Sequence, residues 1–414
     1  MRNSGIFWIV AAFMVLIDLY MFQVLKVVSQ EAGVRTRHFI FSTYWAISVT
    51  AILLFALMPF INFDSWPRFR NYLFATIFGL FLAKVLAAVF FLADDIRRGV
   101  QWTVGKLFFQ NTEGENMNED AISRSSFLSW IGLGLGGTLF SSLLYGFTNK
   151  YNYEVKRIKL AYNNLPEAFR GLKIVQLSDI HSGSFTDKAA VQKGIDRILK
   201  EKADIILFTG DLVNDRAIEM TDYLDVFSRL KAPMGVYSTL GNHDYGDYVR
   251  WESDEAKRNN LESVKRLHKE MGWRLLMNEH VVLDREGQQI ALIGIENWSA
   301  KARFPKHGKM KEAYPGVEKY PFKILMSHDP SHWDAEVRPH YPDIDLALAG
   351  HTHGMQFGIE LPGIKWSPVQ YAYKQWAGLY EEGKQKLYVN RGFGFIGYPG
   401  RVGIMPEITV IELI

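Results

Sequence analysis

The sequence contains no cysteine, so it has no disulfide, thiolate nucleophile or thiolate metal ligand. Any metal site must therefore use oxygen and nitrogen ligands. A strong excess of one charge is also missing. Residues 1–160 hold 15 Lys and Arg against 10 Asp and Glu, and the remaining residues hold 32 against 34. The C-terminal part thus lacks the basic face of a nucleic-acid-binding protein, and we expect no nucleic-acid partner.

Long apolar runs fill the first third of the chain. A helix needs about 20 residues to cross the hydrocarbon core of a membrane, and each run reaches that length. They predict a membrane region at residues 1–151, with helices near 5–28, 38–63, 71–93 and 127–147. The alternative is a set of buried helices in a large soluble domain. Residues 94–126 are expected to form a polar loop.

Two charged residues, Asp18 and Lys84, lie near the middle of the first and third runs. These two helices would cross the membrane in the same direction, so the charges would lie at similar depth. A charge inside a bilayer is costly unless it is paired. We expect the two side chains to face each other, in helix assembly rather than ion transport.

Loop charges do not decide the orientation of the membrane region, because both orientations place similar numbers of Lys and Arg inside. Residues 123–128, Ser-Arg-Ser-Ser-Phe-Leu, resemble an incomplete twin-arginine export signal. We therefore expect a multi-pass protein of the cell (inner) membrane. Its partner would be the lipid bilayer, and its C-terminal domain would lie on the extracytoplasmic side.

From about residue 152 the pattern changes to short β-rich runs and amphipathic stretches. Strands are predicted at residues 155–161, 173–178, 204–209, 235–240, 280–283, 289–295, 323–327, 345–349, 386–390 and 407–413. Helices are predicted at 187–202 and 253–271. Some strands alternate with helices and others follow one another directly. Residues 152–414 are therefore expected to form one layered α/β domain with a mixed sheet or two sheets.

Five of these strands end in residues that can bind a metal ion. The residues at these ends are Asp179 and His181, Asp211, Asn242 to Asp244, His328, and His351 with His353. In open α/β sheets, ligands bind at the carboxyl ends of the strands. A glycine precedes the polar residue at three of the ends, where the backbone must turn or approach a ligand closely. A single histidine at a strand end is usually structural, but five such ends predict a shared site.

The candidate metal ligands outnumber the needs of one ion. They are Asp179, His181, Asp211, Asn242, His328, His351 and His353. This number suits two divalent ions that share a carboxylate, and mixed Asp, Asn and His ligation suits Mn, Fe or Zn. Two ions about 4 Å apart can hold the attacking and leaving oxygens of a displacement at phosphorus. His243 can protonate the leaving oxygen, with Asp244 beside it to orient the imidazole.

These motifs resemble the calcineurin-like metallophosphoesterase superfamily over about residues 152–414. Residues 178–181, 327–330, 351–354 and 406–409 are similar to the membrane-associated YkuE-like bacterial branch. The resemblance implies a two-sheet β-sandwich flanked by helices, a dinuclear centre and His243 as proton donor. It assigns Asp179, His181 and His353 to the first ion, Asn242, His328 and His351 to the second, and Asp211 to both. Met355 departs from the family pattern, which often has glycine there.

The resemblance and the apolar runs together predict a membrane-anchored hydrolase of phosphate ester or pyrophosphate bonds. Its expected substrate is a phosphorylated small molecule or lipid, such as a phospholipid or a lipid-linked envelope compound. One alternative is a non-catalytic membrane sensor or scaffold with a degenerate domain. Another is a transporter with an accessory domain, which Asp18 and Lys84 would serve.

Two further stretches could line the mouth of the site. The basic stretch Lys301–Lys311 could bind phosphate or anionic lipid headgroups. The aromatic stretch Trp366–Tyr380 could lie at the membrane interface. The alternatives are a solvated loop for the first and ordinary packing for the second.

Overall fold

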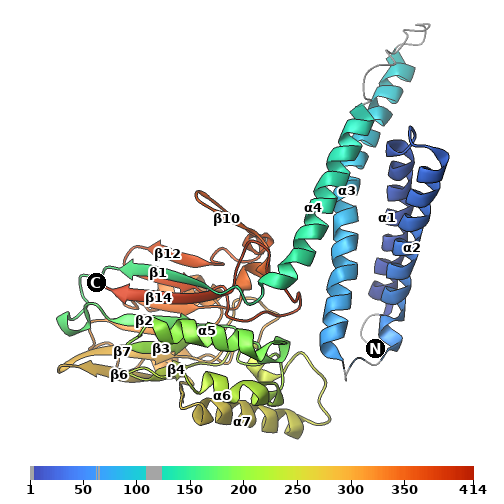
Figure 1. Ribbon diagram of the computed structural model, residues 1–414. Helices are drawn as coiled ribbons and strands as arrows, with labels where there is room; N and C mark the ends of the chain where they lie inside the picture. The colour runs from blue at the N-terminus through green and yellow to red at the C-terminus, as the bar shows by residue number, and fades with distance from the viewer. Residues whose placement is uncertain (1–3, 62, 64–65, 109–123) are drawn as a thin grey trace. The chain divides into compact units, whose positions relative to one another are not determined.

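The structure, a computed structural model, describes residues 4–61, 63, 66–108 and 124–414. The chain divides into two units, Met1–Tyr145 and Gly146–Ile414. The first unit is helical. Its helices are α1 (Ser4–Val28), α2 (Val34–Leu57), α3 (Pro67–Phe108) and most of α4 (Arg124–Asn149) (Figure 1).

Within the described residues, these four helices are long and apolar enough to cross a membrane. The prediction that the four apolar runs form long apolar helices is therefore confirmed. Helices α3 and α4 approach closely at two glycines of α4. A Cβ at Gly132 or Gly136 would collide with the carbonyl oxygens of Ala87 and Ala83. Small residues at such contacts are typical of helix pairs in membranes.

The polar loop predicted for residues 94–126 is wrong over residues 94–108, because α3 continues through them, and over residues 124–126, because α4 begins at Arg124. Charged side chains one turn apart neutralise each other along this part of α3. Arg97 lies 2.8 Å from Asp94, and Arg98 lies 3.3 Å from the same carboxylate. Such pairs stabilise an exposed helix. Residues 109–123 of the predicted loop lie outside the described residues.

The expected pairing of Asp18 with Lys84 is confirmed. Lys84 Nζ lies 2.5 Å from Asp18 Oδ1, and both side chains are nearly buried. The hydroxyls of Tyr44 and Ser48 donate to the same carboxylate oxygen at 2.8 and 3.0 Å. Because α1, α2 and α3 all contribute to this cluster, its contacts fit helix assembly.

The Asp18–Lys84 pair predicts a non-additive double-mutant cycle. Asp18→Asn or Lys84→Met alone leaves one buried charge unpaired, which we expect to cost about 3 kcal/mol of unfolding free energy or more. The double variant should lose much less than the sum of the two single losses. Unfolding titrations of the full chain in detergent measure this. Strictly additive losses would contradict the pairing.

The second unit contains two six-stranded sheets, as the predicted two-sheet sandwich requires. The first sheet has the order β1-β14-β2-β3-β4-β5. Its strands are β1 (Glu154–Leu160), β14 (Glu407–Leu413), β2 (Lys173–Leu177), β3 (Ile205–Phe208), β4 (Val236–Ser238) and β5 (Arg274–Leu275). Strands β2 to β5 run parallel, so their carboxyl ends share one edge.

The second sheet has the order β12-β13-β9-β8-β7-β6. Its strands are β12 (Gly378–Glu382), β13 (Gln385–Val389), β9 (Leu346–Ala349), β8 (Lys323–Met326), β7 (Gln288–Gly294) and β6 (Glu279–Arg285). The four central strands are parallel. A separate hairpin consists of β10 (Ile359–Leu361) and β11 (Ile364–Trp366).

Alternating side chains pack the two sheets together and cover their outer faces. In β3, Ile205 and Leu207 face the second sheet, whereas Ile206 and Phe208 face the helices. The helical layer over the first sheet includes α5 (Lys188–Lys200), α6 (Leu224–Phe227) and α7 (Asp254–Glu270) (Figure 1). Two short helices, α8 (Met310–Ala313) and α9 (Arg338–His340), follow later in the chain.

All ten predicted strands and both predicted helices are present, within a few residues at their ends. Helix α5 begins where Asp187 accepts a hydrogen bond from Ala190 N, as an N-cap does. The strands β5, β10, β11 and β12 were not predicted. Strand β5 has two residues, and β10 and β11 have three each, which is too short for a clear alternating pattern.

Candidate metal centre

The seven predicted ligands all follow strands of the two sheets. Asp179 and His181 follow β2, Asp211 follows β3, and Asn242 follows β4. His328 follows β8, and His351 and His353 follow β9. The structure therefore brings the carboxyl ends of two parallel sets of strands to one site, with both sheets contributing.

The backbone at these strand ends turns back in an unusual conformation. Asp179, His181, Asp211, His351 and His353 all have φ between +48° and +70°. Residues other than glycine rarely adopt this left-handed region, and such strain is concentrated at functional sites. The unusual φ values therefore coincide with the predicted ligands at the ends of β2, β3 and β9.

The ligand atoms form two groups that could each hold an ion. Asp179, His181 and His353 form one group, and Asp211, His328 and His351 form the other. Within each group the atoms lie within 4.8 Å of one another. Asp211 lies between the groups, because its Oδ2 is 3.1 Å from His328 Nε2 and 3.5 Å from His181 Nε2.

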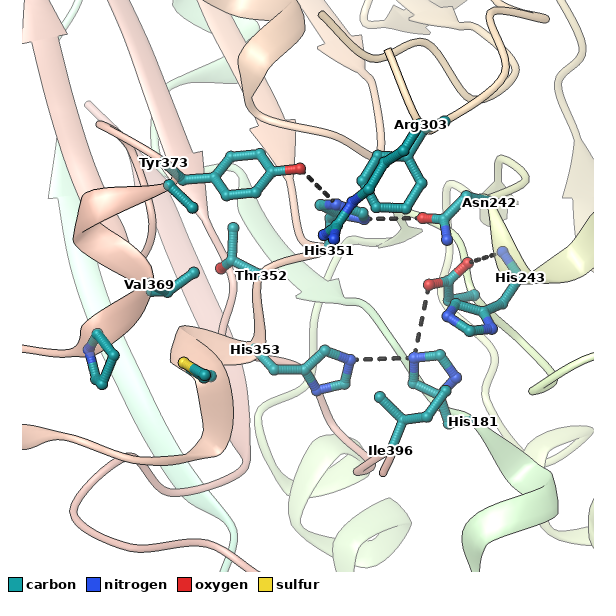
Figure 2. A pocket seen from close by; sticks show the side chains of 15 residues that line it. His181, Asn242, His243, Arg303, His351, Thr352, His353, Val369, Tyr373 and Ile396 are labelled. Carbon is teal, nitrogen blue, oxygen red and sulfur yellow. Dashed lines mark hydrogen bonds and ion pairs between the residues drawn. The ribbon is translucent and has the colours of Figure 1, made fainter. Parts of the chain in front are cut away.

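Figure 2 shows Asn242 and His243 on the side of the site opposite His353. The amide of Asn242 is fixed, because its Nδ2 donates to the Tyr248 hydroxyl at 2.8 Å. Its Oδ1 then faces His351 Nδ1 at 2.8 Å. His243 Nδ1 lies 2.7 Å from the carbonyl oxygen of Asn214 and must donate to it.

The expectation that Asp244 orients His243 is wrong. The buried Asp244 carboxylate instead accepts hydrogen bonds from the backbone N–H groups of Gly241, Asp211, Leu212 and Val213. These bonds fix the loops after β3 and β4 to each other, and the Asn214 carbonyl orients the imidazole of His243. Burial, followed by repulsion from Asp211, raises the pKa of Asp244 to about 7.

The arrangement of acceptor atoms fits bound cations. His328 Nδ1 lies 2.7 Å from the Thr209 carbonyl oxygen, so this nitrogen carries the proton of the neutral ring. The lone pair of Nε2 then points at the Asp211 carboxylate, and two acceptors face each other without a proton between them. A divalent cation relieves this repulsion, and the histidine, carboxylate and amide donors suit Mn, Fe or Zn.

A proton can replace the cation when the site is metal-free. Burial lowers the pKa of His328, but the Asp211 carboxylate outweighs burial and raises the pKa to about 10. Burial likewise opposes ionisation of Asp179, yet His353 holds the pKa of that carboxyl well below its usual range. The site therefore keeps its carboxylates ionised and attracts positive charge.

Sequence reasoning missed the residues that support His351. The Tyr373 hydroxyl lies 2.8 Å from His351 Nε2 and donates to Asp329 Oδ2 at 3.2 Å. Asp329 and Tyr373 are both buried. Such outer partners fix the orientation and tautomer of a ligating histidine. Asp329 lies in the 327–330 motif and Tyr373 in the aromatic stretch, so the sequence drew attention to both segments without revealing their role.

A cavity of about 390 Å³ opens beside the two groups. Its polar side is formed by ligand residues and His243, and the side chain of Arg303 also lines it (Figure 2). Its other wall is apolar and includes Met355, Pro368 and Val369. In the described stretch Lys301–Lys311, Arg303 is the basic residue that lines the cavity, and Phe304 lines it beside Arg303.

Two family models match consecutive parts of the chain. The transmembrane domain of calcineurin-like phosphoesterases matches residues 1–150. The calcineurin-like phosphoesterase domain matches residues 172–355, which contain all seven candidate ligands.

Individual proteins also resemble this chain over most of its length. A zebrafish (Danio rerio) transmembrane protein with a metallophosphoesterase domain is 27% identical over 410 residues, covering 96% of this chain and 86% of its own length. The uncharacterized metallophosphoesterase YkuE of Bacillus subtilis is 28% identical and covers 70% of this chain and 98% of its own. The phosphodiesterase YaeI of Escherichia coli is 28% identical, and the match covers 71% of this chain and 100% of YaeI.

The close packing at Gly350 predicts that Gly350→Ala disrupts the first metal group. A Cβ there would collide with Ser178 Oγ and Asp179 Oδ2, although the backbone of Gly350 itself is unstrained. We expect the purified variant to hold less metal per chain, measured by elemental analysis. Gly33→Ala is the control, because its Cβ would enter open space and Gly33 has an ordinary φ of −59°. Equal metal content in both variants would contradict this account.

The contact between Tyr373 and His351 predicts weaker metal binding in Tyr373→Phe, because the hydroxyl that orients the imidazole is lost. We expect metal affinity to fall about ten-fold, measured by competition with a chelator. Tyr371→Phe serves as the matched control, because Tyr371 is 81% exposed. An unchanged affinity in Tyr373→Phe would show that His351 does not depend on this contact.

Proposed function

Because this chain belongs to the calcineurin-like phosphoesterase family, we propose that it is a membrane-anchored phosphoester hydrolase with a dinuclear metal centre. The convergence of two groups of three ligand residues on Asp211 carries this proposal. The bond it cleaves would be a phosphate ester or a pyrophosphate. The proposal includes the cell (inner) membrane as its location, with the second unit on the extracytoplasmic side.

Each site residue has a proposed task. Asp179, His181 and His353 would hold one divalent ion, Asn242, His328 and His351 the other, and Asp211 both. Two such ions polarise the phosphoryl oxygens and neutralise the charge that develops during the displacement. His243 donates Nδ1–H to the Asn214 carbonyl, which leaves Nε2 to carry a proton to the leaving oxygen. Asp244 supports the site by holding the backbone of Asp211 and Gly241.

The cavity supports an amphipathic substrate. The guanidinium of Arg303 stacks over the Phe304 ring at 4.5 Å, and that ring packs against His351 at 4.8 Å. A cation is thus held beside the proposed second ion, where it can bind a phosphate oxygen. Because the opposite wall is apolar, we propose a phospholipid or a lipid-linked envelope compound as the substrate.

The alternative functions have less support. A degenerate sensor or scaffold domain would be expected to lack ligand residues, whereas the sequence has an Asp, Asn or His at all seven proposed positions. The transporter hypothesis rests on the charges of Asp18 and Lys84. These two side chains pair with each other and with hydroxyl groups in the first unit, which fits a role in helix assembly.

The decisive experiment is a hydrolysis screen of the full chain with added Mn²⁺, using phosphomonoesters, phosphodiesters and lipid pyrophosphates. Asp211→Asn should reduce turnover at least about a hundred-fold, because it removes the charge shared by both ion positions. Asp225→Asn is the control, because its side chain is 66% exposed. Wild-type activity in a folded Asp211→Asn variant would refute the dinuclear mechanism.

A further inference from the structure

The β10–β11 hairpin is amphipathic in an unusual sense, with its charges turned toward the protein. Glu360 and Lys365 are paired across the hairpin and point to the same face. The Glu360 carboxylate lies 2.5 Å from the buried guanidinium of Arg391, and the Lys365 ammonium donates to the Ala377 carbonyl. The charged groups of both side chains therefore contact the domain, although the stem of Lys365 is exposed.

The opposite face of the hairpin is apolar and exposed. Leu361 pairs with Ile364, and Ile359 pairs with Trp366. Ile359, Leu361 and Ile364 are 47%, 60% and 56% exposed. Figure 1 shows β10 standing away from the two sheets of the second unit. A soluble domain normally turns such a face inward, so this surface indicates an apolar partner.

The hairpin begins beside the last turn of α4, whose apolar stretch reaches Asn149. Arg401 N donates to the Gly146 carbonyl at 2.9 Å. The next residue, Val402, exchanges backbone hydrogen bonds with Gln356 and Gly358, directly before β10. If α4 ends at the membrane surface, the base of the hairpin lies at that surface too.

We propose that the hairpin 359–366 inserts its apolar face into the interfacial layer of the lipid bilayer. The partner is thus the bilayer itself, and the inward turn of Glu360 and Lys365 removes the charges that would oppose insertion. Tyr371, whose hydroxyl accepts a hydrogen bond from Trp366 Nε1 at 3.5 Å, adds an aromatic group beside the hairpin. Tyrosine and tryptophan are enriched at such interfaces.

Insertion would place the site at the depth of lipid headgroups. Met355 before the hairpin and Pro368 and Val369 after it line the cavity of the metal centre. A lipid phosphate could then enter along the apolar wall without leaving the membrane. This last step rests on the proposed function, whereas the insertion itself does not.

The absence of native cysteine allows a direct test. The full chain carrying Leu361→Cys is labelled with a fluorophore and reconstituted into phosphatidylethanolamine–phosphatidylglycerol vesicles containing brominated lipid. We expect the brominated lipid to quench the label by about two-fold and aqueous iodide to have little effect. Val282→Cys on β6, at the opposite edge of the second sheet from β12, should show the reverse. A label at residue 361 that iodide quenches as strongly as the one at residue 282 would overturn the proposal.

Kinetics separate insertion from catalysis. The double variant Leu361→Ser, Ile364→Ser should hydrolyse soluble bis(p-nitrophenyl) phosphate at the wild-type rate and a phosphoester lipid in vesicles about ten-fold more slowly. Equal rates on the vesicle substrate would overturn delivery through the hairpin. If the wild type hydrolyses neither substrate, the proposed function is refuted, whereas the quenching result remains valid.

The labelling experiment has one further outcome. If neither quencher reaches the label at residue 361, the apolar face contacts a protein partner, and membrane insertion is overturned.

Discussion

The buried carboxylate of Asp211 is the group on which the site depends. A buried charge is costly unless opposite charge and hydrogen bonds compensate it. Its Oδ1 accepts from the backbone N–H of His243 at 2.8 Å, and its Oδ2 faces His328 and His181. One oxygen therefore organises the loop that carries His243, and the other requires a cation or a proton between itself and the imidazoles.

The need to hold the Asp211 carboxylate in place also accounts for the hydrogen bonds between the loops around the site. Asp244 takes up four backbone N–H groups from the two loops after β3 and β4, so it fixes the position from which Asp211 projects. Glycine is needed at Gly210, where φ is +98° and a Cβ would collide with Gly241. Two loops can therefore pack against each other and still present polar side chains to a common centre.

Strands and ligands could be predicted from the sequence because both follow local patterns. A buried strand of apolar residues ends visibly at the first run of Asp, His or Gly, as at Thr209–Asp211. The support of the site depends instead on tertiary contacts. Tyr373 reaches His351 from 22 residues away, and Asn214 reaches His243 from 29 residues away. Because Asp244 is next to His243 in the sequence, it was expected to orient the imidazole. Its carboxylate instead accepts hydrogen bonds from backbone N–H groups.

The direction of the hairpin's faces likewise depends on a tertiary contact. Strands β10 and β11 are too short for periodicity to predict them, and a soluble domain would normally bury the apolar side chains of such strands. The contacts of Glu360 with Arg391 show the reverse, because the buried guanidinium draws the carboxylate inward. Arg401 lies at the base of this region. Its backbone is bonded to the last turn of α4, and its buried side chain donates to the carbonyl oxygens of His353 and Arg391. Within the second unit, Arg401 therefore contacts the end of α4, the base of the hairpin and the loop that carries His353, so the proposed membrane contact of the hairpin and the proposed metal centre depend on the packing of the same arginine.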